Sequence, residues 1–191
     1  MKTILSIALF FILVSFLPEK MSNNECVAQI TANSVLFIKG TSNVNTFICN
    51  YSITSLERKI NMSYREKGSV IAFNNAVLTL KNDGFDCGGK MINKDFHELL
   101  KSDDYPDINL ELQKIIKHDF GYTAYVIIEI AKKKSNYAIP VNQSNSGSKY
   151  SGKMDVNIID FGLTPPKKMM GMIVVHENIE IHFDFDVRIT K

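Results

Sequence analysis

Two short motifs in the sequence resemble loops that hold phosphate or metal in nucleotide-dependent enzymes. Gly40-Thr41-Ser42-Asn43 has one glycine and no following Gly-Lys-Ser/Thr, so it lacks the spacing of a phosphate-binding loop, and we interpret it as a β-turn or bulge between strands. Asp160-Phe161-Gly162 matches three letters of the kinase metal-binding motif, but no catalytic-loop sequence accompanies it and the chain is too short for a kinase. We interpret this second motif as a strand end followed by a turn.

The histidines do not form a recognisable metal or catalytic motif. The chain has four of them, His97, His118, His176 and His182, and none has a Cys or His partner at zinc-ligand spacing. We therefore expect solvated or locally hydrogen-bonded histidines and no metal site. A Gly-x-Ser-x-Gly sequence that would mark a nucleophile is also missing. These patterns favour a protein that is not an enzyme.

The first residues have the pattern of an export signal. Lys2 precedes an apolar stretch from Ile4 to Leu17, and Pro18 and a polar run follow it. At about 14 residues this stretch is shorter than the ~20 that cross a bilayer as a helix, so a cleaved signal peptide is favoured over an uncleaved anchor. We expect a signal peptide and leader over residues 1–28, one folded domain over residues 29–191, and a periplasmic or secreted protein.

Export determines how the three cysteines are interpreted, because thiols in an oxidising compartment tend to pair. Cys26 lies in or beside the leader, which leaves Cys49 and Cys87 as the natural pair. Their bridge would close a loop of about 38 residues and stabilise the fold by ~3 to 4 kcal/mol on the chain-entropy model. The alternative is two buried thiols.

Composition and charge exclude some classes of partner. The 191 residues are 45% hydrophobic and 22% charged, as expected for one globular unit. Twenty-two Lys and Arg against 20 Asp and Glu give a formal charge of +2, with no basic stripe, so a nucleic-acid partner is not expected.

Hydrophobic residues along the body of the chain recur mainly with a period of two. In the segment from Ile179 to Ile189 every odd position is apolar and every even position is charged or His. This alternation predicts a strand with one solvent-exposed face. Further strands are expected at residues 34–39, 47–53, 59–64, 70–81, 108–113, 122–131, 137–141, 153–161 and 172–176. Eight or more strands in one domain predict an all-β meander, sandwich or barrel.

One segment breaks this alternation and predicts a short helix. Phe96, Leu99 and Leu100 have helical spacing, Asn93 is a plausible N-cap, and Pro106 forces extended geometry before the next strand. One or two short helices are therefore expected within the sheet.

Several landmarks resemble the YceI-like family of exported lipid- or polyisoprenoid-binding proteins. They occur in the order expected for that family and cover roughly residues 34–189. They are Ser34-Val35-Leu36-Phe37-Ile38-Lys39-Gly40-Thr41-Ser42-Asn43-Val44-Asn45-Thr46-Phe47, Leu99-Leu100-Lys101-Ser102-Asp103-Asp104-Tyr105-Pro106-Asp107-Ile108, Asp160-Phe161-Gly162-Leu163-Thr164-Pro165-Pro166, Met169-Met170-Gly171-Met172 and the final strand. Where many relatives have His-Asp-Trp, this chain has Asn45-Thr46-Phe47.

The resemblance implies an extended, antiparallel, lipocalin-like β-barrel of about eight strands that encloses a polyisoprenoid, such as an isoprenoid quinone, or a similar lipid. A barrel of this size either holds one small ligand or is filled by its own side chains. The residues expected to line the cavity are the apolar side chains that the alternation places on the inner face: Phe37, Phe47, Ala124, Val126, Ile128, Phe161, Phe183 and Phe185.

Two functions from different classes follow. The first is a non-enzymatic carrier with an apolar lipid ligand, no metal and no other cofactor, with weak membrane association possible. The second is a secreted interaction or structural module whose barrel is filled by its own side chains. The sequence leaves the oligomeric state open, a dimer included.

Overall fold

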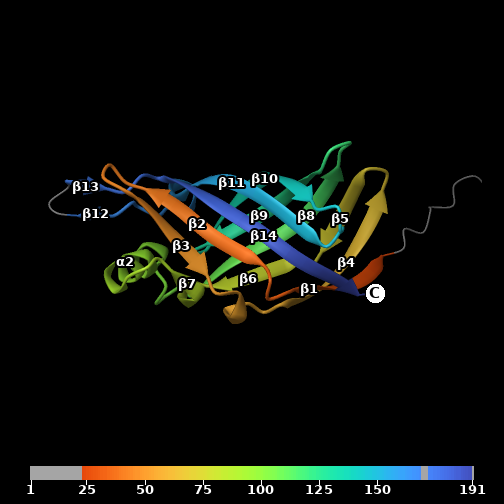
Figure 1. Cartoon of the computed structure of the whole chain (residues 1–191), viewed down its shortest axis with the longest axis horizontal. Coiled ribbons are helices and arrows are strands. Elements are labelled where there is room, and N and C mark those ends of the chain that lie inside the picture. The colour runs from red at the N-terminus through yellow and green to blue at the C-terminus, as the bar shows by residue number, and fades with distance from the viewer. Residues whose placement is uncertain (1–22, 169–171, 191) are drawn as a thin grey trace, which may run out of the picture.

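The alternating segments form long antiparallel strands that ring round a common axis (Figure 1). The computed structural model describes residues 23–168 and 172–190. The strands of the main sheet are β1 (Asn24–Ile30), β2 (Val35–Thr41), β3 (Thr46–Tyr51), β4 (Lys59–Lys67), β5 (Val70–Asn74), β6 (Val77–Lys81), β7 (Phe85–Asp86), β8 (Asp107–Lys117), β9 (Tyr122–Ile130), β10 (Lys133–Gln143), β11 (Lys149–Asn157) and β14 (Asn178–Thr190). A separate pair consists of β12 (Lys167–Lys168) and β13 (Ile173–Val174).

Helical segments are short and lie between strands. The α-helix is α2 (Lys90–Leu100), and single 3₁₀ turns occur at η2 (Ile53–Ser55), η3 (Asn82–Gly84) and η4 (Ile158–Phe161). The predicted helix is therefore confirmed, but it begins at Lys90 with Gly89 as N-cap rather than at Asn93.

The barrel closes through β1. Neighbouring strands follow the order β1-β4-β5-β8-β9-β10-β11-β14, and β1 also pairs with β14, so that eight strands form a ring. The expected all-β, lipocalin-like barrel is confirmed.

Two long strands change partners along their length and thereby extend the barrel. Along one edge of β14, residues 180–184 pair with β2 and residues 187–190 pair with β1. Likewise, β8 pairs first with β6 and then with β5. The strands β2, β3, β6 and β7 consequently extend the wall toward α2, whereas β4 and β5 lie toward the other end (Figure 1).

The expected boundary at residues 28/29 falls inside a strand. Residues 24–29 of β1 pair with β4, and residues 27–30 pair with β14, which places Cys26 in the buried inner layer. The barrel thus includes residues that the sequence pattern assigned to the leader. The apolar stretch from Ile4 to Leu17 lies outside the described residues. Among the residues that the structure describes, no helix is long and apolar enough to span a membrane.

Two expected strands are interrupted for local reasons. The stretch 70–81 divides into β5 and β6 at Asn75, which has φ = 60° and therefore leaves the extended conformation. The stretch 153–161 ends as a strand at Asn157, whose side-chain oxygen accepts a hydrogen bond from the Ile159 amide and starts η4. Asp160-Phe161-Gly162 forms a turn, as expected: Asp160 and Phe161 end η4, and the backbone of Gly162 has the left-handed conformation.

Inward-pointing side chains fill the middle of the barrel. On β9, Ala124, Val126, Ile128 and Ile130 are all buried, as a period of two requires. The largest fully buried apolar side chains are Phe161, Ile128, Leu163 and Val156, each 1% exposed.

Candidate ligand-binding cleft

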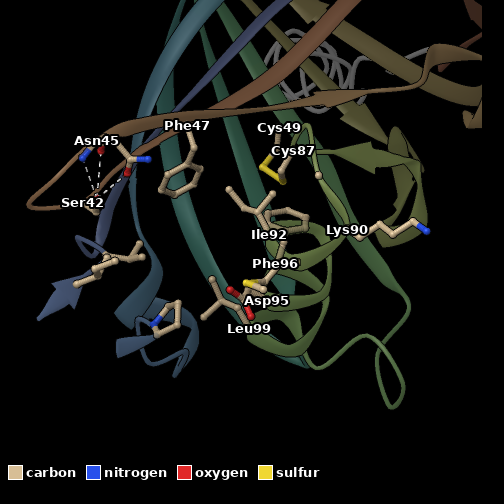
Figure 2. A pocket seen from close by; sticks show the side chains of 15 residues that line it. Ser42, Asn45, Phe47, Cys49, Cys87, Lys90, Ile92, Asp95, Phe96 and Leu99 are labelled. Carbon is tan, nitrogen blue, oxygen red and sulfur yellow. Dashed lines mark hydrogen bonds between the residues drawn. A yellow bond between two sulfur atoms is a disulfide. The ribbon is translucent and has the colours of Figure 1, made fainter. Parts of the chain in front are cut away.

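An apolar cleft of about 440 Å³ opens at the α2 end of the barrel (Figure 2). One wall is α2, a second is β3 with the β2–β3 turn, and a third comes from Pro166, Ile173 and Val175. Most of the lining is apolar; it comprises Ser42, Asn45, Phe47, Cys49, Cys87, Gly89, Lys90, Met91, Ile92, Asp95, Phe96, Leu99, Pro166, Ile173 and Val175.

Phe47 forms the β3 wall, and its position depends on Gly40. The two residues are directly opposite each other in the β2–β3 ladder. A Cβ atom at residue 40 would overlap the Phe47 ring, so the absence of a side chain at Gly40 allows the ring to lie flat against β2.

The opposite wall follows from the apolar spacing of α2. Ile92, Phe96 and Leu99 recur at three- and four-residue intervals, which places them on one helix face, and this face lines the cleft. Leu100 belongs to the buried core instead, and Phe96 packs against Phe85 of β7 with ring centroids 5.3 Å apart. Lys90 points away from the cavity in Figure 2.

A disulfide and an Asx network fix the start of α2. Cys49 of β3 is bonded to Cys87, which confirms the expected pairing. The Cys87 amide donates to the side-chain oxygen of Asn93 (2.7 Å), and the Asn93 amide group donates to Asp86 Oδ1 (2.9 Å). Asn93 therefore bonds to the loop before α2 rather than capping the helix.

Asp86 accepts a second hydrogen bond in this loop, from the Gly88 amide at 2.9 Å. The bonds from Asn93 and Gly88 stabilise the ionised carboxylate and hold the pKa of Asp86 below its ordinary value.

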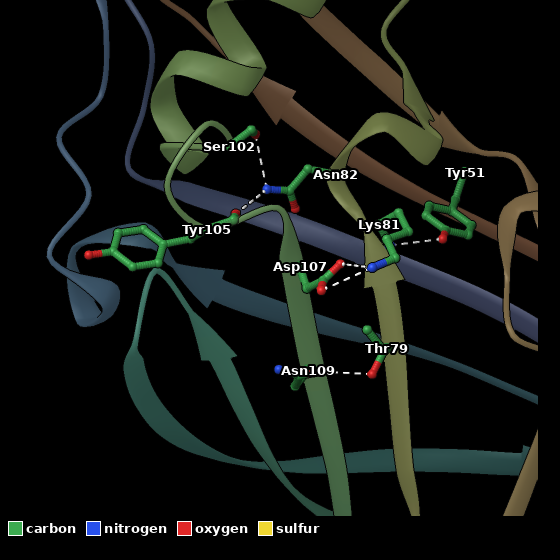
Figure 3. Close-up of polar contacts among 8 residues, drawn as sticks. All are labelled: Tyr51, Thr79, Lys81, Asn82, Ser102, Tyr105, Asp107 and Asn109. Carbon is green, nitrogen blue, oxygen red and sulfur yellow. Dashed lines mark hydrogen bonds and ion pairs between the residues drawn. The ribbon is translucent and has the colours of Figure 1, made fainter.

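Buried polar contacts fix the end of α2 (Figure 3). Asn82, 1% exposed, donates to Ser102 Oγ (3.0 Å) and to the carbonyl oxygen of Tyr105 (2.8 Å). Its neighbour Lys81 forms an ion pair with Asp107 at 2.8 Å, which raises the pKa of Lys81. These bonds tie the chain after α2 to η3 and to the start of β8.

The third wall is attached to the β2–β3 turn by Asn43. The Asn43 side chain donates to the Met172 carbonyl (2.8 Å) and accepts from the Val174 amide (3.0 Å), so it pairs with that segment as backbone would. Ser42 Oγ bonds to Asn45 Oδ1 (2.8 Å) and closes the turn. The turn itself lies between Thr41 and Thr46, later than the predicted residues 40–43, because Gly40 and Thr41 still pair with β3. Through Asn43 this turn is also an attachment point for the wall.

Solved structures share the overall fold of this chain. BcnA from Burkholderia cenocepacia aligns with a TM-score of 0.63 and 15% identity over 84% of this chain and 98% of that chain. A polyisoprenoid binding domain from Saccharophagus degradans, implicated in plant cell wall breakdown, aligns with a TM-score of 0.53 and 8% identity over 84% of this chain and 97% of that chain. The chain has the YceI-like fold. Neither a protein-family model nor a curated protein sequence matches it.

Within this YceI-like fold, seven of the eight residues expected to line the cavity face the core: Phe47, Ala124, Val126, Ile128, Phe161, Phe183 and Phe185. Of these, Phe47 lines the cleft, whereas the other six pack against one another and their neighbours in the barrel interior. The Phe183 and Phe185 rings, for example, stack with centroids 5.3 Å apart.

The prediction for Phe37 is wrong. Leu36 and Ile38 are the buried residues of β2, so Phe37 lies on the outer face, where its ring stacks on His182 at 4.6 Å. The cause is that β2 is apolar at both Phe37 and its neighbours, so alternation alone does not identify the inner face.

Sequence reasoning missed most of the cleft lining. The spacing of Phe96 and Leu99 predicted a helix, but it did not identify them as the wall of a cavity. Ile173 and Val175 belong to the strand expected at residues 172–176, but the sequence pattern does not place that strand beside α2, and only the folded chain brings these residues into the same cleft.

The histidines lie apart from one another. His97 is 3.7 Å from Asp83, His118 bonds to Thr123, His176 bonds to Thr41, and His182 bonds to Glu180. Across residues 23–168 and 172–190, no group of three or more His, Cys, Asp or Glu side chains could hold a metal ion.

Proposed function

We propose that the protein is an exported, non-enzymatic lipid carrier that binds the apolar chain of a polyisoprenoid, such as an isoprenoid quinone, in the cleft beside α2. The observation that carries this proposal is an apolar cleft on a YceI-like barrel. The likeness to a polyisoprenoid binding domain gives the ligand class to test first.

The lining suits an apolar chain. The cleft volume of about 440 Å³ lies within the range of ~300–1,000 Å³ that is usual for small-molecule sites. Each methylene group removed from water contributes ~0.8 kcal/mol, so apolar contacts with Ile92, Phe96 and Val175 can supply the affinity without a charged anchor.

The volume also limits how much of a ligand fits. At ~30 Å³ for each water-sized group, the cleft accommodates roughly fifteen non-hydrogen atoms, or about three isoprene units. A longer tail would extend into the barrel or past the rim. The cleft is thus a site for one end of a chain.

The disulfide supports the proposed export, because disulfides persist in oxidising compartments and are rare in the cytosol. The bond also joins two residues of the cleft wall. An oxidising compartment would therefore preserve a bond that holds this wall together.

The second candidate, an interaction module, draws support from the packed barrel interior around Ile128, Val156 and Phe161. Organic extraction of the purified protein followed by mass spectrometry separates the two. A co-purifying prenyl lipid supports the carrier. A parent that carries no lipid and does not bind added farnesol favours the module.

A matched pair of variants on α2 tests whether the ligand binds in the cleft. Ile92→Ser changes a cleft residue and should reduce farnesol affinity by roughly tenfold. Lys94→Ser changes a side chain that is 75% exposed on the same helix and should leave the affinity unchanged. Equal affinities for the two variants would show that the ligand does not occupy the cleft.

A further inference from the structure

Three large apolar side chains are exposed at the opening of the cleft. Met91 of α2 is 79% exposed, Met172 before β13 is 64% exposed, and Val44 in the β2–β3 turn is 62% exposed. Single exposed apolar residues are ordinary on protein surfaces, so their significance depends on where they lie.

These residues come from the three walls that form the cleft. Met91 lines the opening itself. Val44 lies between Ser42 and Asn45, which also line it, and the Asn43 side chain bonds the Met172 backbone to the same turn. We name Val44, Met91 and Met172 the rim. In Figure 1, α2, β13 and the turn after β2 lie at the same end of the molecule.

Two rim residues are chain neighbours of apolar residues that line the cleft. Ile173 and Ile92 line the cavity, and their chain neighbours Met172 and Met91 extend the apolar surface outward into solvent. A tail that leaves the cleft at this end would therefore pass over apolar atoms rather than over a charged collar.

Charges on α2 are balanced. The helix carries Lys90 and Lys94 against Asp95 and Glu98, and Lys94 pairs with Glu98 at 3.6 Å. The charges of α2 by themselves therefore give no electrostatic preference for an anionic lipid surface over a zwitterionic one.

We propose that the rim inserts into the interface of a lipid bilayer and aligns the cleft with the membrane, so that the apolar chain passes between bilayer and protein without crossing water. This inference rests on the proposed function, since the ligand it delivers is the lipid of the cleft. Exposed Met and Val side chains gain free energy when they enter the acyl boundary.

The test measures flotation of the purified protein with phosphatidylcholine vesicles, with and without phosphatidylglycerol. The parent should float with both kinds of vesicle and show little dependence on salt. Val44→Ser/Met91→Ser/Met172→Ser should reduce vesicle affinity by at least roughly tenfold. Phe120→Ser is the matched control, because Phe120 is 97% exposed in the turn after β8, at the opposite end of that strand from α2.

Three outcomes would overturn the inference: no flotation of the parent, an undiminished affinity in the rim variant, or an equal loss in Phe120→Ser. The first would indicate that a protein, rather than a bilayer, covers the rim. A parallel titration with farnesol in detergent micelles tests the proposed function separately. Val44→Ser/Met172→Ser leaves every lining residue of the cleft in place and should bind micellar farnesol as the parent does. If the parent itself fails to bind farnesol in micelles, the proposed function fails whatever the flotation result.

Discussion

At the scale of single residues, Phe47 and Gly40 together determine how much of the cleft is open. The Phe47 ring occupies the space that a side chain at residue 40 would need. In Gly40→Ala the ring must move away from β2, and the cleft is the side on which space is open. We expect farnesol affinity to fall by roughly tenfold, as for the loss of about one to two buried methylene groups.

Val35→Ala is the control for this prediction, since Val35 lies on the same strand and is exposed on the outer face. Calorimetric titration gives both affinities, and thermal melts show whether each variant is folded. A Gly40→Ala protein that binds as tightly as the parent would show that Phe47 does not limit the site.

Asp86 gives the start of α2 a pH dependence whose sign follows from its hydrogen bonds. Because the folded pKa is below the ordinary 3.8, the stabilisation is fully present above that value and is lost as pH falls through the folded pKa. Asp86→Asn should therefore melt below the parent near neutral pH, and the difference should shrink in acid below about pH 4. A difference in melting temperature that stays constant from about pH 6 to about pH 3 would contradict this assignment.

At the scale of secondary-structure elements, the disulfide holds the start of α2 against β3. It joins residues 38 positions apart, and Cys49 and Cys87 both belong to the cleft wall. Cys49→Ser/Cys87→Ser should reduce the free energy of unfolding by about 3 to 4 kcal/mol, chiefly because the unfolded chain gains conformational entropy when the cross-link is absent. It should also weaken farnesol binding, since the covalent link between β3 and the start of α2 is lost, and the Asn93 network and the β3–β7 pairing remain to hold the helix.

Treatment of the parent with a reductant gives an independent version of this experiment and should produce the same two changes. Chemical denaturation measures stability, and calorimetric titration measures binding. If stability falls while affinity is unchanged, the bond supports the fold but does not shape the cleft.

Elements were predictable from sequence where the period was long and unambiguous. The segment from Ile179 to Ile189 alternates strictly and forms β14, and β9 buries alternate residues as expected. The start of β1 was missed because residues 1–28 were assigned to an expected signal peptide and leader. Phe37 was assigned to the wrong face because apolar residues flank it on both sides. Alternation specifies a strand, whereas the face also depends on its partners.

The cleft was less predictable than the barrel that carries it. Its walls come from β3, from α2 and from Pro166, Ile173 and Val175. These segments are distant in sequence and are brought together by β-pairing, the disulfide and the Asn43 bonds. The resemblance pointed to the fold, but at Asn45-Thr46-Phe47 the chain departs from the pattern of many relatives, and Asn45 and Phe47 line the cleft. Likeness of fold therefore leaves the ligand to be determined at this site.

At the scale of the whole molecule, the histidines lie outside the cleft lining. This placement determines how ligand binding should respond to pH. None of the four histidines is among the lining residues, and His182 lies on the outer face, stacked on Phe37 and bonded to Glu180. Unperturbed histidines change charge between about pH 5 and pH 8, so an apolar site without histidine should bind equally well across that interval.

Bound lipid per protein, measured by extraction at several values across that interval, should therefore stay constant in both the parent and His182→Ala. Ile92→Ser should lower it at every pH, which shows that the assay detects a damaged site. Loss of lipid in acid would instead indicate His176, whose ring bonds to Thr41 next to the wall that Val175 forms. His176→Gln would then remove the pH dependence, because an amide can bond to Thr41 but does not titrate.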